Sequence, residues 1–300
     1  MDGIINVYKE KGFTSHDVVA VMRKIANQKK IGHTGTLDPE AEGVLPVCLG
    51  KATKLADYIM ASEKQYRAMV RLGITTTTED ASGEVLEERP VDVTEEELQK
   101  ALLSMEGEQM QVPPMYSALK VNGKKLYELA REGKEVERKA RKVTIFGIRL
   151  LQFLPPDRAE ILVDCSKGTY IRTLCADLGK RLGCGAHMET LLRTKSGRFT
   201  LENACSLEEL RTLAAENRLE EALLSMEEAL MQYPAVTVQP RADRLMANGC
   251  KIFAPHWKQQ EENLTLGQTV RGYNSQGHLM GLYTVEEAEE LFLKPQKMLL

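Results

Sequence analysis

The chain has 300 residues, of which 43% are hydrophobic and 28% are charged, and its formal net charge is −3 at pH 7. This composition indicates a globular protein with a full core and room for one large and one small domain. No apolar run approaches the ~20 residues of a membrane-spanning helix, so we expect no membrane partner. The N-terminus lacks the basic flank and cleavage site of a signal peptide, and we therefore expect a cytoplasmic location.

The first half of the chain predicts strands and helices in alternation. Apolar periodicity and capping residues, such as the capping box that begins at Thr94, mark their limits. In chain order they are a strand over 3–8, a helix over 14–27, a helical stretch over 51–62, a strand over 65–75, a polar turn region over 75–85 and a helix over 94–105.

A loop is expected over residues 30–46, because three glycines and two prolines interrupt regular structure there. Asp38 precedes Pro39, whose ring favours extended geometry in the residue before it, so the carboxylate is presented from a stiffened turn. This placement suits a nucleophile or a base. The alternative is an Asp that caps a helix or closes a turn. The loop is not a phosphate-binding loop, since that pattern needs Gly and Ser or Thr where the chain has Leu45 and Ala52.

A basic segment follows Pro114. Between residues 120 and 142 there are four acidic residues and nine basic ones, namely Lys120, Lys124, Lys125, Arg131, Lys134, Arg138, Lys139, Arg141 and Lys142. Clustered Lys and Arg attract phosphates, so the segment is a candidate surface for nucleic acid. The alternative is a solvated charged face without a partner.

The second half predicts further strands and helices and then a change of domain. A helix over 173–182 stops at Gly183, and helical sequence follows Ser206 with interruptions. Tyr233-Pro234 is the best domain boundary. The predicted strands are 142–154 and 159–164 before that boundary, and 235–238, 269–273 and 279–283 in a small β-rich module after it.

The six cysteines show no C-x-x-C pair and no nearby pair of histidines. Zinc sites and disulfide frameworks have regular spacings of these residues, so the sequence predicts neither. We expect reduced, mostly buried cysteines and no metal.

Two long stretches, residues 32–39 and 43–54, resemble the catalytic motif of the TruB family of tRNA pseudouridine synthases. The similarity covers most of the first two thirds of the chain. Further matching segments occur in the family's order at 64–67, 78–83, 114–120, 165–172 and 182–187.

The resemblance implies an α+β fold with two domains. Residues 1–232 would form the pseudouridine synthase catalytic domain, a mainly antiparallel mixed sheet flanked by helices, with residues 114–142 as a basic RNA-binding insertion. Residues 233–300 would form a PUA-like RNA-binding domain.

The resemblance also implies a reaction, the isomerisation of the uridine at position 55 in the tRNA T-loop to pseudouridine. This reaction breaks the bond between uracil N1 and ribose C1′ and joins C5 to C1′. It needs a carboxylate nucleophile and a dry pocket rather than a redox group. We therefore expect no cofactor, the T-arm stem-loop of tRNA as partner, and no obligate protein partner.

Motif positions assign roles to individual residues. The resemblance implies Asp38 as the nucleophile, Tyr66 as the active-site tyrosine and Arg172 as the partner that aims Asp38. Whether Asp38 attacks the base or the ribose stays open. His33 would occupy the gap left by the flipped uridine. The residues implied to contact the substrate or RNA are His33, Tyr170, Leu192, Lys120, Lys124 and Lys125.

Two alternative functions stay open at this point. One is a non-catalytic RNA-binding or tRNA-folding protein of the same fold. The other is the guide-RNA-dependent branch of the family, which works with protein partners and lacks the basic insertion over 114–142. The presence of that insertion favours the stand-alone enzyme.

Overall fold

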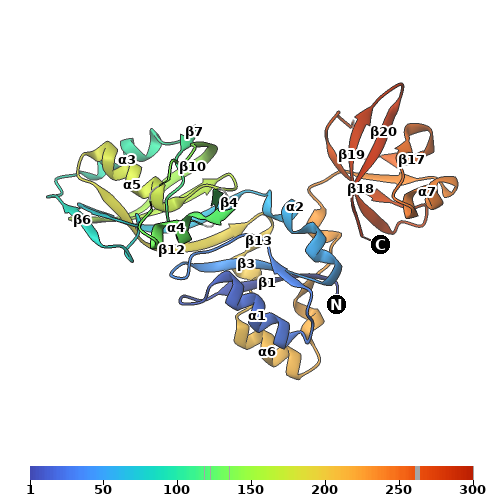
Figure 1. Cartoon of the computed structure of the whole chain (residues 1–300), viewed down its shortest axis with the longest axis horizontal. Coiled ribbons are helices and arrows are strands. Elements are labelled where there is room, and N and C mark those ends of the chain that lie inside the picture. The colour runs from blue at the N-terminus through green and yellow to red at the C-terminus, as the bar shows by residue number, and fades with distance from the viewer. Residues whose placement is uncertain (118, 122, 135, 261–263, 300) are drawn as a thin grey trace.

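The computed structural model of the chain describes residues 1–117, 119–121, 123–134, 136–260 and 264–299. A ten-stranded sheet and a six-stranded sheet organise these residues, and two small two-stranded sheets lie beside the larger one (Figure 1). Helices pack against the ten-stranded sheet. This arrangement confirms the expected α+β fold with a separate β-rich C-terminal region. Of the described helices, none is long and apolar enough to cross a membrane.

The ten-stranded sheet is mixed and mainly antiparallel, as expected. Along it the strands run in the order β14 (Leu223–Leu224), β1 (Gly3–Lys9), β3 (Glu42–Leu49), β12 (Ala186–Ser196), β4 (Lys64–Leu72), β11 (Arg158–Cys165), β10 (Arg141–Leu154) and β7 (Gly107–Gln111), with β2 (Ile31–His33) beside β3 and β13 (Phe199–Thr200) beside β12. The pairing of β12 with β3 is parallel, whereas the other strand pairs described for this sheet are antiparallel.

Strand β3 corrects the expected loop over 30–46, because residues 42–49 form a central strand of the sheet. Pro46 lowers the strand signal of this apolar run, but pairing with β1 on one side and β2 and β12 on the other overrides it. The sequence also does not predict β6 (Val85–Glu88), which pairs with β5 (Ile74–Thr76), or β7. The residues of both strands are mostly exposed, and neither strand shows the alternation of apolar and polar residues that marks a half-buried strand.

Each half of the large sheet has its own pair of helices (Figure 1). On β1 and β3, α1 (Ser15–Ile25) and α6 (Leu207–Ala215) enclose a core that includes Val18 and Leu210. On the other half, α3 (Glu95–Leu103) and α5 (Ile171–Leu182) pack over β4, β10 and β11. The predicted capping boxes at Thr94 and Ser206 are present. The short helices are α2 (Ala56–Met60), which follows a 3-10 turn, and α4 (Leu126–Arg131).

The C-terminal sheet has a separate core that includes Val236, Val270 and Tyr283. Its strands run in the order β16 (Ile252–Phe253), β20 (Leu291–Met298), β19 (Leu279–Glu287), β18 (Thr269–Tyr273), β15 (Ala235–Val238) and β17 (Trp257–Gln260), with α7 (Asp243–Ala247) beside them. Figure 1 shows this module next to α2. Lys54 Nζ donates to the Met298 carbonyl at 2.9 Å there, and Leu282 packs with residues of the large domain.

Helix α5 lies unusually close to the start of β12. A Cβ placed on Gly179 would overlap the backbone of Gly185 and Ala186, so only glycine allows this approach. Since Arg172 lies in the first turn of α5, the contact also fixes the position of that side chain.

We predict that Gly179→Ala lowers the free energy of unfolding by about 1–3 kcal/mol, even though alanine favours helices, because the added methyl group overpacks the contact with β12. Gly147→Ala is the matched control. Its Cβ would lie 3.9 Å from the nearest atom, so it should be neutral or slightly stabilising. Urea unfolding measures both, and equal losses would contradict the close approach of α5.

Candidate active site

A buried lysine, Lys9, holds the loop that carries Asp38 in place. Lys9, which has no exposed surface, donates from Nζ to the carbonyls of Glu10, Pro39 and Ala41. Burial lowers the pKa of its ammonium group to about 8. The Leu37 N–H donates to Ser15 Oγ at 2.9 Å, which ties the other end of the loop to α1. Because both ends are anchored, the Asp38 carboxylate has a defined place.

Arg172 connects Asp38 to two other segments. Its Nε lies 3.1 Å from Asp38 Oδ2 and its Nη1 lies 3.6 Å from Asp80 Oδ2. Its Nη2 donates to the Tyr116 carbonyl at 2.8 Å, and its Nη1 donates to the Thr78 carbonyl. The Arg172 side chain is only 5% exposed, whereas the Asp38 side chain is 40% exposed, so the guanidinium is buried and the carboxylate faces the pocket. The two residues that the motifs link, Asp38 and Arg172, are therefore in contact.

The surroundings of Asp38 shift the pKa of its carboxyl group in opposite directions. Burial raises the pKa of its carboxyl group above the ordinary value, Arg172 opposes this rise, and Asp80 adds to it. Without Arg172 the carboxylate would lose the interaction that most favours its charged, nucleophilic form.

Tyr66 lies in the middle of the large sheet, on β4, opposite Val163 of β11 and Arg193 of β12. It is 9% exposed. Burial raises the pKa of its phenol, while the positive charge of Arg193 opposes that rise. The ring is thus a neutral, nearly buried surface at the floor of the site.

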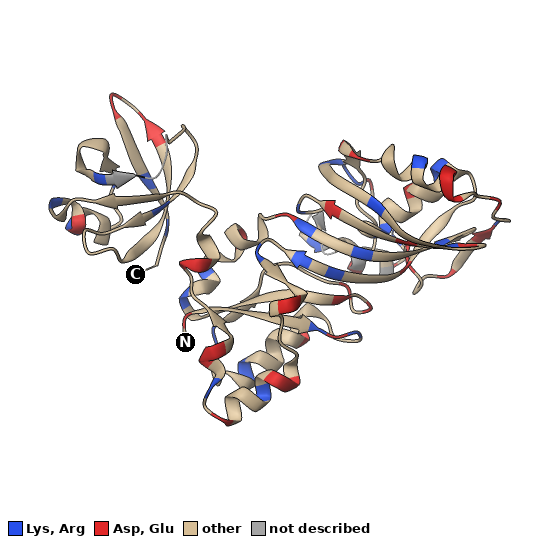
Figure 2. Cartoon of the chain, turned by 180° about the vertical axis from the view of Figure 1, so that it is seen from behind, with Lys and Arg blue, Asp and Glu red and all other residues tan. Residues whose placement is uncertain are grey.

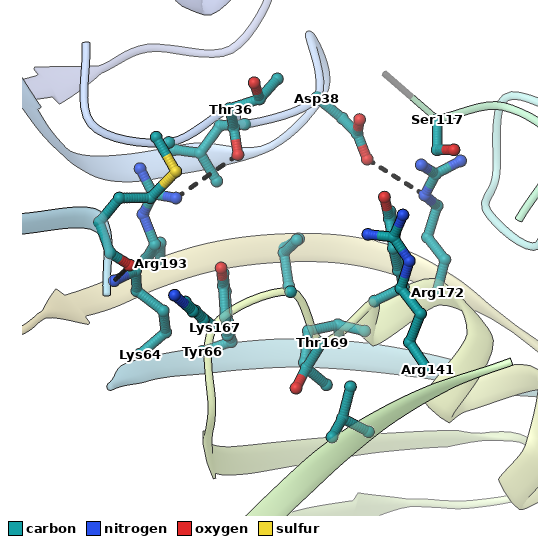
Figure 3. Close-up of a pocket in the computed structure, with 18 of the residues that line it drawn as sticks. Thr36, Asp38, Lys64, Tyr66, Ser117, Arg141, Lys167, Thr169, Arg172 and Arg193 are labelled. Carbon is teal, nitrogen blue, oxygen red and sulfur yellow. Dashed lines mark hydrogen bonds and ion pairs between the residues drawn. The ribbon is translucent and has the colours of Figure 1, made fainter. Parts of the chain in front are cut away.

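Asp38, Tyr66, Arg172 and Tyr170 line one pocket of about 560 Å³. Figure 3 shows Asp38 above Tyr66, with Arg172 on one side and Arg193 on the other. The ionisable lining residues other than the tyrosines are one acid, Asp38, and the cations Lys64, Arg141, Lys142, Lys167, Arg172 and Arg193. Six cations against one carboxylate make the pocket suitable for an anionic ligand such as a nucleotide.

Tyr170 lines this pocket, whereas His33 does not; His33 lies two residues before Gly35, which does. The His33 ring accepts from the Gly35 N–H and packs edge-on against His16, with ring centroids 5.5 Å apart. Burial lowers the pKa of His33. Tyr170 exchanges two hydrogen bonds between its backbone and the Gln111 side chain, which places it directly before α5.

The expectation for Leu192 needs correction. Leu191 and Arg193, its neighbours on β12, line the pocket. Since successive side chains of a strand point to opposite faces, Leu192 lies on the other face of the sheet. Leu191, rather than Leu192, therefore faces the pocket.

Three of the lysines of the basic segment, Lys120, Lys124 and Lys125, lie in a small hairpin made of β8 (Lys120–Val121) and β9 (Lys124–Lys125). Leu119, directly before it, lines the pocket. Lys124 pairs with Glu132 at 3.4 Å and is 58% exposed. The side chains of Lys120 and Lys125 lie outside the described part of the structure, as does Ala118 of the motif.

Sequence reasoning did not assign roles to Lys9, Lys64, Asp80 and Arg193. Lys64 and Asp80 fall in matching segments, and Lys9 directly follows an expected strand. In the sequence alone, a buried charged residue at such a position is indistinguishable from an exposed one. Their burial and contacts are tertiary. Among the described residues, His, Cys, Asp and Glu side chains form no group of three that could hold a metal ion.

Comparisons with known proteins identify the family. Residues 23–171 match the profile "TruB family pseudouridylate synthase (N terminal domain)", and residues 172–231 match "tRNA pseudouridylate synthase B C-terminal domain". The chain is 47% identical to a tRNA pseudouridine synthase B of Clostridium perfringens, with 94% of both chains covered. It is 48% identical to that of Alkaliphilus oremlandii, with 85% of this chain and 84% of the relative covered.

Solved structures give the same result. A Cbf5-Nop10-Gar1 complex contains a chain with a TM-score of 0.80 and 28% identity, covering 99% of this chain and 85% of that one. A chain of an H/ACA RNP bound to a substrate RNA has a TM-score of 0.78 and 26% identity over 99% and 85%. The resemblance of the motifs is thereby confirmed: this chain belongs to the TruB family of pseudouridylate synthases.

Proposed function

We propose that this protein isomerises the uridine at position 55 in the T-loop of tRNA to pseudouridine. The observation that carries the proposal is the Asp38 carboxylate, paired with the buried Arg172 at 3.1 Å in a cation-lined pocket. Relatives 47–48% identical to this chain are named tRNA pseudouridine synthase B.

Asp38 acts as the nucleophile in this reaction. It attacks either the ribose C1′ or the uracil ring, the bond between N1 and C1′ breaks, the base rotates, and C5 bonds to C1′. Arg172 keeps the carboxylate ionised where burial would otherwise favour its neutral form. Tyr66 stacks under the base and stands where it can accept a proton.

RNA binding places the uridine in the pocket. Since a stacked base cannot reach Asp38, the uridine must be flipped out, and the flat ring of His33 fills the gap it leaves. The exposed Lys and Arg residues at the pocket rim, together with Lys120, Lys124 and Lys125 of the 114–142 insertion, contact phosphates. Tyr170 and Leu191 enclose the flipped base.

The domain division follows from the same proposal. Residues 1–232 are the catalytic domain, and residues 233–300 are a PUA-like RNA-binding domain. The enzyme needs no obligate protein partner and acts in the cytoplasm. The sheet and core that follow residue 233 support this boundary.

The guide-RNA-dependent branch is the weaker alternative. Its relation to this chain rests on structures that are 26–28% identical, whereas the relatives named tRNA pseudouridine synthase B are 47–48% identical. Activity of the isolated chain on a tRNA transcript, without guide RNA or added protein, separates the two.

We predict that the parent protein releases tritium from uridine labelled at C5 in a tRNA transcript and that Asp38→Asn does not, because the amide is a poor nucleophile. Tritium counting under excess tRNA measures this. Asp92→Asn is a matched control, since Asp92 is exposed and lies outside the pocket.

Retained tRNA binding without tritium release by any variant, parent included, would favour the non-catalytic RNA-binding alternative. Full tritium release by Asp38→Asn would show that Asp38 is not the nucleophile, although the protein would still be an enzyme.

We predict that Arg172→Met moves the acid limb of the pH–rate profile to higher pH. The reaction needs ionised Asp38, so the rate falls as pH drops through the pKa of that carboxyl. Removing Arg172 removes the charge that opposes the burial-induced rise of this pKa. The rate at neutral pH should also fall by about 100-fold.

Single-turnover rates across the acid and neutral range check this expectation. Arg172→Lys keeps a positive charge and should leave the acid limb closer to that of the parent. An acid limb that stays in place in Arg172→Met would mean that Arg172 does not control the ionisation of Asp38.

A further inference from the structure

Arg193 is the largest fully buried side chain of the described residues, with 1% of its surface exposed. It lies on β12, where its backbone pairs with Tyr66 of β4 on one side and with Gly43 of β3 on the other. Figure 3 shows its guanidinium on the side of the pocket formed by Thr36 and Lys64, across from Arg172. Neither the reaction steps nor the ion pair of Asp38 described above uses it.

The guanidinium of Arg193 is incompletely paired. Its Nε donates to the Val44 carbonyl at 2.7 Å and its Nη1 to the Thr36 carbonyl at 3.5 Å. Its Nη2 is buried and has no hydrogen-bond acceptor in the described structure. None of the described carboxylates lies within ion-pair distance of it. A buried cation without a counter-ion is costly, and guanidinium groups stay charged, so this side chain needs a negative partner from elsewhere.

A second buried cation, Lys64, adds to the positive charge that has no described counter-ion at this end of the pocket. Lys64 is 6% exposed, and its Nζ donates to the Ser62 carbonyl at 2.6 Å and to the Met60 carbonyl at 3.2 Å. Burial and then the charge of Arg193 lower the pKa of Lys64 to about 8. Thus two neighbouring cations at one end of the pocket have only neutral acceptors. The single carboxylate of the lining, Asp38, is already paired with Arg172 at the other end.

The position of these cations indicates which part of a nucleotide they face. Arg141, Lys142 and Lys167 at the pocket rim are exposed, so they can meet phosphates that remain in water. Arg193 is buried beside Tyr66, at the depth of the base rather than the backbone. Bringing a phosphate to that depth would require its desolvation.

We propose that Arg193 is a further catalytic residue: its Nη2 donates to a carbonyl oxygen of the uracil and stabilises the negative charge that the base acquires during the reaction. The inference rests on the proposed function. Lys64 strengthens the same positive end of the pocket.

The charge arises from bond breaking. When the N1–C1′ bond breaks, its electron pair stays on the base and is shared with O2 and O4. The base then forms the C5–C1′ bond, loses the proton of C5 and gains one at N1, so no co-reactant is needed. If Asp38 instead first adds to the ring, electrons again move toward a carbonyl oxygen. The role of Arg193 is the same for both routes.

The test compares two T-arm stem-loop RNAs, one with uridine and one with 5-fluorouridine at the target position. Fluorine withdraws electrons, so the fluorinated base carries negative charge with less help. We expect Arg193→Gln to lower the single-turnover rate about 100-fold with uridine but no more than about tenfold with 5-fluorouridine. The readout is loss of the target nucleoside after digestion of the RNA, measured with enzyme in excess at saturation.

Two further variants separate charge stabilisation from structure. Arg193→Lys keeps the charge and should show a smaller loss of rate and a smaller difference between the two RNAs. If Arg193→Gln does not fold, Arg193→Lys is used for the comparison of the two RNAs. Lys167→Gln removes a cation at the rim and should weaken RNA binding with equal effect on both RNAs.

Equal losses with both RNAs in the Arg193 variants would overturn the inference, because a residue that only holds Thr36 and Val44 in place would affect both bases alike. This outcome is distinct from failure of the proposed function, in which the parent protein itself would convert neither RNA.

Discussion

The active site depends on the seam where the two halves of the large sheet join. Leu192 pairs with Glu42 and Arg193 pairs with Gly43 across this short parallel contact. Gly43 has a φ of +107°, and a Cβ there would overlap the Arg193 carbonyl, so the approach of the strands requires glycine. The loop with Asp38 comes from one half, whereas Tyr66 and Arg172 come from the other. The seam therefore sets the distances between the reacting groups.

Charge is distributed unevenly around this seam. The chain is weakly acidic overall, yet its pocket has six cations and one carboxylate. Figure 2 shows basic residues on neighbouring strands in the middle of the large sheet. Two cations of the pocket, Lys64 and Arg193, and also Lys9 outside it, are buried and, among the described residues, donate only to backbone carbonyls. Burying them lowers stability, and a negatively charged substrate would offset that cost. The positive charge of the pocket therefore fits the proposed binding of RNA better than a role in folding.

Much of the fold and part of the site could be predicted from the sequence. Alternating apolar residues and capping boxes gave α1, α3, α5, β10 and β11 close to their observed limits, because these signals are local. Long, specific motifs led to the prediction of Asp38, Tyr66 and Arg172 as site residues, and the structure places all three in one pocket. Strand β3 was partly missed, since Pro46 weakens a strand signal that pairing on both sides restores. Leu192 was chosen over Leu191 because the motif does not say which face of β12 meets the pocket.

The sequence by itself thus determined the family, the fold class and the residue types that the reaction needs. Only the tertiary structure decided which side chains share one pocket, because residues as distant as Asp38 and Arg172 are joined by strand pairing and not by spacing. The role inferred for Arg193 likewise depends on burial and on a missing hydrogen-bond partner. Neither property can be seen in a linear sequence, where a buried arginine and an exposed one are written with the same letter.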